Sequence, residues 1–225
     1  MTSEGWERLE QRERVAAVAR IVARAGLVHA FGHVSARTDD GLLLTPVAPA
    51  LWGLGAEDIR ALAADGSPMD GDRRLVPLEA PMHAAIYRAR PDVGAICRIH
   101  GHAAAAWAAR AEPPPLLHGF GGIVEPVATW PDANLVSDAA AGEGVAAALG
   151  AAPAILLRGN GGLAVGRDLP EAAARAWCLE DRCEVAERAG PAGVPFSPDE
   201  LVRRNRWYEK ETARLWAWLL ATYGA

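Results

Sequence analysis

Residues 77–102 read PLEAPMHAAIYRARPDVGAICRIHGH. Apolar residues in the first half repeat at helical spacing, which predicts a helix over 80–88 that begins just after Glu79. Pro91 predicts the end of that helix, because proline disfavours helical geometry in the residue before it. The apolar run over 93–99 then predicts a buried strand, so this stretch indicates a helix followed by a strand of a central sheet.

His100 and His102 stand two residues apart at the end of the predicted strand. Side chains at i and i+2 share one face of a strand, so a strand that continues to His102 would direct both imidazoles into one pocket. Imidazole binds zinc, iron and nickel, and the pair predicts a divalent metal site completed by a carboxylate or a third histidine. The alternative is two surface histidines on either side of Gly101.

Helices and short strands alternate along the rest of the chain. We expect further helices at 7–25, 56–63, from 103, at 142–149 and from 170, the last being long and rich in alanine. We expect further strands at 31–36, 42–45, 74–76, 123–127, 154–157 and 163–165. Hairpins mix with crossovers in this order, which predicts an α/β fold with a mixed, mainly antiparallel central sheet covered by helices on both faces.

The length and composition fit one domain. A chain of 225 residues that is 51% hydrophobic can bury one substantial core. We expect residues 1–190 to form that domain. The proline-rich start of 191–225 reads as a connector to a C-terminal helix, which we expect to belong to the same domain or to a subunit contact.

Charge and cysteine usage exclude several classes of protein. The net charge of −5 comes from interspersed acidic and basic residues, so no basic stripe exists to bind nucleic acid. No apolar run approaches the roughly 18–20 residues that a membrane span needs. Cys97, Cys178 and Cys183 form no CxxC pair, which fits a reducing compartment. These features predict a cytoplasmic protein with no membrane and no nucleic acid partner.

Lysine is almost absent from the chain, and this limits its mechanism. Lys210 is the only lysine, and it lies where charges and tryptophans alternate at helical spacing, as on a solvated helix face. Carbonyl activation without a metal usually needs a desolvated lysine that forms a Schiff base. The composition therefore favours a metal as the electrophile over a lysine.

Three motifs in order point to one family. Residues 77–92 resemble a glutamate followed by HxxIYxxRPD, residues 32–37 (GHVSAR) resemble a GNxSxR loop, and residues 158–161 (RGNG) resemble an NHG loop. All three are motifs of the class II aldolase/adducin family, and the resemblance covers about residues 10–190. It implies a three-layer α/β/α fold and a homotetramer that acts on a small molecule.

The resemblance also implies roles for individual residues. In that family the glutamate is the general acid/base and three histidines hold a metal that stabilises an enediolate, so Glu79 takes the glutamate's role. The three ligand positions fall on Arg98, His100 and Asn160, only one of which is a histidine. A divalent metal (zinc, iron, nickel or manganese) therefore stays open, as does its absence. We expect Glu79, Arg98 and His100 to be catalytic, with Arg98 holding a substrate carboxylate or an oxyanion.

The substrate class follows from the same comparison. The matching positions predict substrate-binding roles for Gly32, His33, Ser35 and Asn160. Most hydroxyl donors that cradle phosphate in the sugar-phosphate members are replaced here by apolar residues, at 47–48 and 77–78. We expect a lyase of aldolase or decarboxylase type that acts on a small, non-phosphorylated carbonyl or carboxylate compound through an enolate-like intermediate. A mononuclear iron oxygenase or isomerase on the same fold and a non-catalytic, adducin-like assembly protein are the alternatives.

Overall fold

A seven-stranded sheet forms the centre of the computed structural model, which describes residues 1–224. The strands are β1 (His33–Arg37), β2 (Gly41–Leu44), β3 (Arg60–Ala63), β4 (Ala95–Ile99), β5 (Val127–Trp130), β6 (Ala154–Leu157) and β7 (Gly162–Gly166). Their order across the sheet is β3-β2-β1-β4-β7-β6-β5. β5 and β6 run parallel, and the other neighbours run antiparallel. The prediction of a mixed, mainly antiparallel sheet is confirmed.

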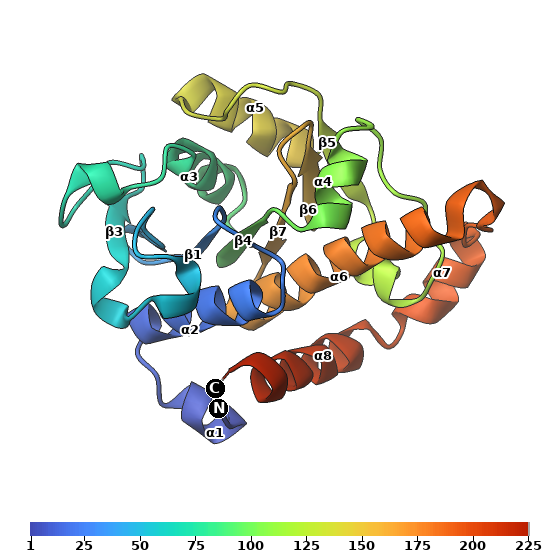
Figure 1. The fold of residues 1–225 in the computed structure, drawn as a ribbon, viewed down its shortest axis with the longest axis horizontal. Coiled ribbons are helices and arrows are strands. Elements are labelled where there is room, and N and C mark those ends of the chain that lie inside the picture. The colour runs from blue at the N-terminus through green and yellow to red at the C-terminus, as the bar shows by residue number, and fades with distance from the viewer. Residues whose placement is uncertain (225) are drawn as a thin grey trace.

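Helices cover both faces of this sheet (Figure 1). One face packs against α2 (Gln11–Arg24), α4 (His102–Ala108), α6 (Leu169–Ala189) and α8 (Tyr208–Tyr223). The other face packs against α3 (Ala80–Ala89) and α5 (Ala139–Leu149). Two shorter helices are α1 (Ser3–Glu7) and α7 (Pro198–Asn205). The predicted three-layer α/β/α arrangement is confirmed.

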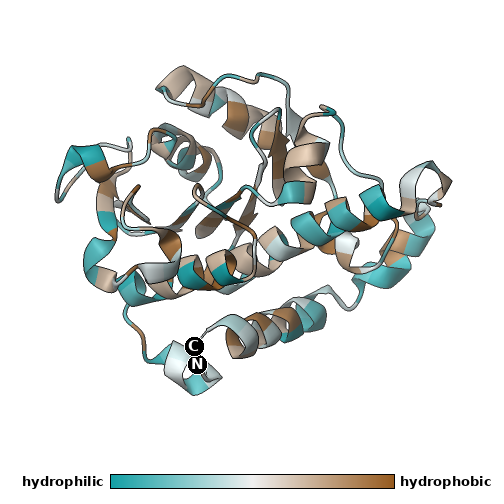
Figure 2. Ribbon diagram, in the orientation of Figure 1, coloured by the Kyte–Doolittle hydropathy of each residue, from teal (hydrophilic) through white to brown (hydrophobic). Residues whose placement is uncertain are grey.

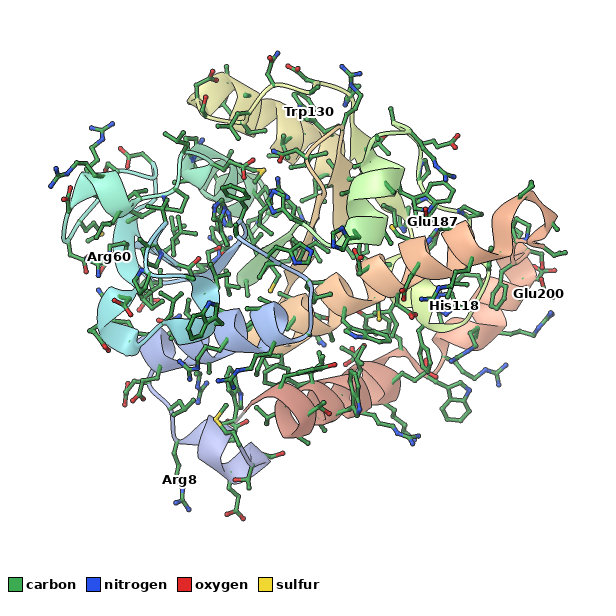
Figure 3. All side chains as sticks on the ribbon, viewed as in Figure 1. Arg8, Arg60, His118, Trp130, Glu187 and Glu200 are labelled. Carbon is green, nitrogen blue, oxygen red and sulfur yellow. The ribbon has the colours of Figure 1, made fainter. Side chains whose placement is uncertain are left out.

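Alternation along the strands sorts side chains between two hydrophobic cores. In β4, Ala95, Cys97 and Ile99 enter the core beneath α2 and α6, whereas Ile96 enters the core beneath α3 and α5. Figure 2 shows the hydrophobic residues gathered on the central strands and hydrophilic ones on the outer helices. The charged side chains of Arg8 and Glu200 lie at the periphery (Figure 3), and that of Glu187 is exposed. Arg98, whose side chain lies on the same face of β4 as Ile96, differs from these charged residues because it is fully buried.

The helix predicted over 56–63 is not formed. A single 3₁₀ turn covers Ala56–Asp58, and the chain then enters β3 at the edge of the sheet. β3 pairs with β2, with Gly41 opposite Ala63. Eight residues carry too little periodicity to distinguish a helix from a turn and a strand, and the hydrogen bonds to β2 favour the strand here.

Two predicted strands are 3₁₀ turns in the structure, at 73–75 and 120–124. The side chain of Asp72 accepts a hydrogen bond from a backbone N–H inside the first turn, so local side-chain bonding replaces a strand ladder. The second region becomes a strand only at Val127, directly after Pro126. Proline has no N–H to donate to a ladder, which delays the strand.

The C-terminal region folds back onto the helical layer. It contains two helices, α7 and α8, where a single helix was predicted. Leu219 and Leu220 of α8 are buried in the core shared with α2 and α6. The rings of Trp6 and Trp216 meet edge to face at 4.9 Å, which joins α8 to the start of the chain. Within residues 1–224, no helix is both long enough and apolar enough to cross a bilayer.

Candidate active site

A cavity of about 460 Å³ opens where several loops meet the N-terminus of α3. Its walls are mainly apolar, and four polar residues form its floor: Glu79, His33, His100 and Asn160. The apolar lining consists of Ala30, Phe31, Gly32, Pro46, Val47, Leu51, Pro77, Leu78 and Leu135. Of the seven residues predicted to be catalytic or substrate-binding, the cavity therefore gathers Gly32, His33, Glu79, His100 and Asn160.

Glu79 occupies the N-cap position of α3 but does not cap the helix with its side chain. Its carboxylate turns into the cavity and is 5% exposed. Oε1 accepts a hydrogen bond from Nδ2 of Asn160 at 3.1 Å and lies 3.5 Å from Nη2 of Arg98. Oε2 has only looser neighbours, Nε of Arg98 at 3.4 Å and Nδ1 of His33 at 4.0 Å. Oε2 is thus the oxygen best placed to accept a proton.

Arg98 lies behind Glu79 and is fully buried. Its Nη1 donates to the carbonyl oxygens of Ile99 at 2.7 Å and Gly162 at 3.1 Å. The loop before β7 passes so close that a Cβ on Gly161 would lie 2.6 Å from the Ile99 oxygen, and Gly161 also has a positive φ of 71°. Glycine is therefore required at that position.

Arg98 was predicted to contact a substrate, but this arrangement does not allow that contact. Arg98 does not line the cavity, and its guanidinium is occupied by two carbonyl oxygens and the Glu79 carboxylate. The cause is the pleat of β4, which directs this side chain under the N-terminus of α3 rather than out of the sheet edge. Arg98 acts on Glu79 and positions its carboxylate.

Asn160 connects Glu79 to His100. Because a carboxylate only accepts, the amide of Asn160 presents Nδ2 to Glu79 and Oδ1 to the other side. Oδ1 lies 3.2 Å from Nε2 of His100, so that nitrogen donates. A neutral His100 then carries its proton on Nε2, and Nδ1 keeps its lone pair. The backbone N–H of His100 donates to Leu27 at 2.9 Å, which fixes the chain beyond β4.

His33 brings a second imidazole to the floor of the cavity. It stands opposite Arg98 in the pairing of β1 with β4, and its ring lies 5.6 Å from that of His83 on α3. Ser35, predicted to bind substrate, is fully buried away from the cavity, where its hydroxyl lies 2.8 Å from both Nδ1 of His83 and the hydroxyl of Tyr87. Ser35 therefore supports His83 and does not reach a ligand in the cavity.

Burial keeps the three neighbouring histidines neutral. It lowers the pKa of His83 to about 3, with the charge of Arg98 contributing. It also lowers the pKa of His100 to about 4, again helped by Arg98. The pKa of His33 falls well below its usual value, through burial first and then the charges of His83, Arg98 and His100. All three imidazoles are uncharged near pH 7, and of the two that line the cavity only His33 keeps an N–H that Asn160 does not already accept.

These shifts predict acid sensitivity of the fold. In the unfolded chain the imidazoles take up protons below pH 6.5, whereas folded His83 stays neutral down to about pH 3. The stability that the neutral imidazoles contribute is complete above pH 6.5 and is lost progressively as the pH falls toward 3. Urea denaturation between pH 7.5 and 4.5 should show a falling free energy of unfolding.

A double variant, His33→Asn with His83→Gln, should flatten this pH dependence because it removes two of the titrating groups. Ser35→Ala is the matched control, since it removes the hydroxyl beside His83 and no titratable group. It should keep the wild-type slope. Equal slopes in the wild type and the double variant would contradict the assignment to these histidines.

His102 does not join His100, contrary to the metal pair predicted from their spacing. β4 ends at Ile99, Gly101 is the N-cap of α4, and His102 is the first residue of that helix. The helix turns the His102 side chain outward, where it is exposed and its ring lies 4.5 Å from that of His29. His102 lines a different cavity from His100. The alternation argument fails because the strand stops before the second histidine.

The donor set of the cavity does not fit a divalent cation. Within residues 1–224, no group of three or more histidine, cysteine, aspartate or glutamate side chains is arranged to hold a metal. Asn160 has both amide atoms engaged, and Nε2 of His100 is engaged with it. The buried charge of Arg98 would repel a divalent ion by about 7 kcal/mol at a separation of about 5 Å and an effective dielectric constant of about 20.

Several lining residues carried no signal in the sequence. Phe31, Leu51 and Leu135 were not predicted to belong to the site, and the cavity brings them together from three segments that are far apart in the sequence. No motif links them, because apolar residues in separate segments share no spacing. Pro77, Leu78 and Val47 do line the cavity, at the positions where the sequence comparison found apolar replacements of phosphate-binding residues.

Known proteins provide an independent comparison. A 3,4-dihydroxyphthalate decarboxylase from Terrabacter sp. (strain DBF63) is 30% identical over 201 residues, which cover 81% of this chain and 82% of that protein. A probable bifunctional methylthioribose-1-phosphate isomerase/methylthioribulose-1-phosphate dehydratase from Nocardia farcinica is 32% identical over 201 residues, covering 80% of this chain. This chain spans only 36% of the length of the Nocardia protein.

A solved structure and a family match lead to the same assignment as these relatives. The structure of an aldolase II superfamily protein from Pseudomonas syringae superposes with a TM-score of 0.80 at 22% identity, covering 99% of this chain and 100% of that one. That likeness concerns the fold. Residues 13–186 match the family described as Class II Aldolase and Adducin N-terminal domain. With most of its length matched, the chain belongs to the class II aldolase and adducin family.

Proposed function

We propose that this protein is a carbon–carbon lyase of the decarboxylase or aldolase type, which acts on a small, non-phosphorylated carboxylate with an aromatic or other apolar part. The observation that carries the proposal is the position of Glu79. Its carboxylate is held by Asn160 and Arg98 at the floor of a cavity with apolar walls, and Oε2 is left without a close hydrogen bond. A positioned carboxylate of this kind can take a proton from a bound substrate and return it.

The lining of the cavity disfavours a phosphorylated substrate. None of the side chains that line it is lysine, arginine, serine or threonine. A phosphate group carries close to two charges and needs several donors when it leaves water. The N–H of neutral His100 is donated to Asn160, so only the imidazole of His33 can offer an N–H to a ligand, which suits a single oxyanion better than a phosphate dianion.

The rim of the cavity favours an apolar ligand. Phe31 is 72% exposed, Leu78 is 69% exposed and Val47 is 55% exposed, and all three border the opening. A ligand ring placed between these side chains would remove their apolar surface from water, which is favourable by roughly 25 cal/mol per Å². The ring of Phe31 lies 6.2 Å from that of His100, so a ligand that contacts Phe31 is also near the polar floor.

The reaction needs only one proton carrier. In an aldol cleavage, Glu79 takes the proton of a substrate hydroxyl group, the adjacent carbon–carbon bond breaks and an aldehyde leaves, and the bonding electron pair is delocalised onto a neighbouring oxygen as an enolate-like anion, whose carbon then receives the proton back from Glu79. In a decarboxylation, Glu79 takes the proton of a ring hydroxyl group and gives it to the ring carbon that bears the carboxylate. Carbon dioxide then leaves, and the bonding electron pair restores the ring as a phenolate. The N–H of His33 is available to stabilise the anionic oxygen, whereas that of His100 is donated to Asn160.

The relatives support a decarboxylase more than a sugar-phosphate enzyme. The Terrabacter protein, whose name specifies an aromatic dicarboxylate, matches this chain along most of both lengths. The Nocardia protein, whose name specifies a sugar phosphate, is matched over about a third of its length. The mainly apolar lining of the cavity suits an aromatic carboxylate better than a sugar phosphate.

The test is a substrate comparison with purified protein. We expect release of carbon dioxide from 3,4-dihydroxyphthalate or a related hydroxylated aromatic carboxylate, measured by mass spectrometry together with the decarboxylated product. Fuculose 1-phosphate, ribulose phosphates and methylthioribulose 1-phosphate should react on the order of 100-fold more slowly or not at all. Efficient cleavage or dehydration of a sugar phosphate would refute the proposed substrate class.

Two further readouts separate the alternative activities. An oxygen electrode in the same reactions should show no consumption of oxygen, whereas oxygen uptake linked to turnover would indicate an oxygenase. Lack of turnover with every carboxylate in a broad panel would favour an adducin-like assembly role over a lyase.

A further inference from the structure

We infer that the guanidinium of Arg98 is the permanent counter-charge of the reaction, so that this site operates with no divalent cation. The chemical part of this inference rests on the proposed function. Its first test, metal binding, needs no substrate and stands independently.

The position of Arg98 is fixed by the protein alone. Nη1 is held by the carbonyl oxygens of Ile99 and Gly162, and Nε and Nη2 face the two oxygens of Glu79 at 3.4 and 3.5 Å. The side chain has no exposed surface. A buried charge with every contact inside the protein cannot reorient toward water, so it stays beside Glu79 throughout a catalytic cycle.

This placement keeps the charge of the site balanced during proton transfer. Before the reaction, the negative charge on Glu79 faces the guanidinium. When Glu79 has accepted a proton, its carboxyl group is neutral and the negative charge resides on the enolate-like oxygen of the substrate. Apart from the charge of the substrate carboxylate, which is the same in both states, the guanidinium stays protonated and faces one negative charge before and after the transfer, and the transfer moves charge only a short distance within its field. A metal ion is not required to neutralise the intermediate.

The residues around Glu79 suggest how such a site relates to a metal site. Arg98, His100 and Asn160 occupy the positions that match the family's three histidine ligands, and the structure places all three in one contact chain with Glu79. Two of the three side chains lack an imidazole. Replacing those two by histidine would place three imidazoles around one point, which suits zinc or cobalt.

The decisive experiment compares metal binding by the wild type and by Arg98→His/Asn160→His. Both proteins are stripped with chelator, dialysed and titrated with Co²⁺, which is followed by visible absorption and elemental analysis. We expect stoichiometric binding by the double variant and no stoichiometric binding by the wild type. Adding His100→Ala to the double variant should abolish binding, because it removes the third imidazole.

Stoichiometric binding of Co²⁺ or Zn²⁺ by the stripped wild type, lost in His100→Ala, would overturn the inference. The titration of the wild type and His100→Ala is decisive even if the double variant folds poorly. If the wild type binds no metal but turns over none of the carboxylates, the proposed function fails while the metal-free assignment stands.

The counter-charge role has its own readout in steady-state kinetics. Arg98→Met should lower kcat much more than it raises KM, because Arg98 does not touch the substrate cavity. Arg98→Lys restores a positive charge and should recover part of kcat. An Arg98→Met enzyme that folds and keeps the wild-type kcat would refute the role, since a merely structural contribution would appear in stability alone.

Discussion

Glu79→Gln should lower turnover by about 10²–10⁴-fold, the usual contribution of a general acid/base. Glutamine has the same shape, and its amide oxygen can still accept the hydrogen bond from Nδ2 of Asn160. It has no basic oxygen to take a proton at Oε2. Substrate binding should survive, so the loss should appear in kcat in the decarboxylation assay.

The matched control is Glu180→Gln. Glu180 is a carboxylate on α6 that accepts backbone hydrogen bonds from Ala103 at 2.8 Å and Ala104 at 3.0 Å, outside the Glu79 cavity. Its substitution should leave kcat near that of the wild type. Retention of full activity by a correctly folded Glu79→Gln protein would remove Glu79 from the mechanism and leave His33 or His100 as the proton carrier.

Arg98→Met should reduce the free energy of unfolding by about 3–5 kcal/mol, the usual cost of leaving one member of a buried ion pair without its partner. Arg98 is fully buried and Glu79 is 5% exposed, so solvent screens the pair very little. Methionine fills most of the side-chain volume, which leaves the unpaired carboxylate as the main source of the loss. Urea denaturation at pH 7.5 measures it.

The double variant Arg98→Met/Glu79→Gln should recover much of this stability, because neither side chain then carries a buried charge. Arg188→Met serves as the surface control. Arg188 pairs with Glu184 at 2.7 Å, but both side chains are largely exposed, and such pairs contribute little. If Arg98→Met and Arg188→Met have the same small effect, the pair with Glu79 is not energetically coupled in the way the geometry indicates.

The sequence predicted the elements that carry the site better than the directions of the side chains on them. The helix that begins after Glu79, the strand that bears Arg98 and the glycine-rich loop of Asn160 were all predicted close to their observed places. Helical spacing and apolar runs determine such elements locally. The same reasoning placed His102 beside His100, and it failed because the end of β4 depends on where α4 starts.

Other parts of the site depend on contacts between distant segments. His33 meets Arg98 only because β1 pairs with β4 in one register, and a shift by one residue would turn it to the other face. Ser35 shares the face of His33, yet helix α3 covers it and its hydroxyl bonds to His83. Motifs in a single sequence give the order of these residues along the chain, but the register and the covering helix determine which of them reach the cavity.

Because β4 and the loop before β7 enclose Arg98, the positive charge of the site is part of the polypeptide and does not have to be bound from the cell. A bound ion must be acquired after synthesis, competes with other ions and can be removed by scavengers. A side chain is made with the polypeptide, in a fixed ratio of one to each Glu79, and becomes active as soon as the sheet closes around it. If Arg98 is the counter-charge, the total activity of this protein in a cell is proportional to the amount of protein and does not change with the concentration of zinc or iron.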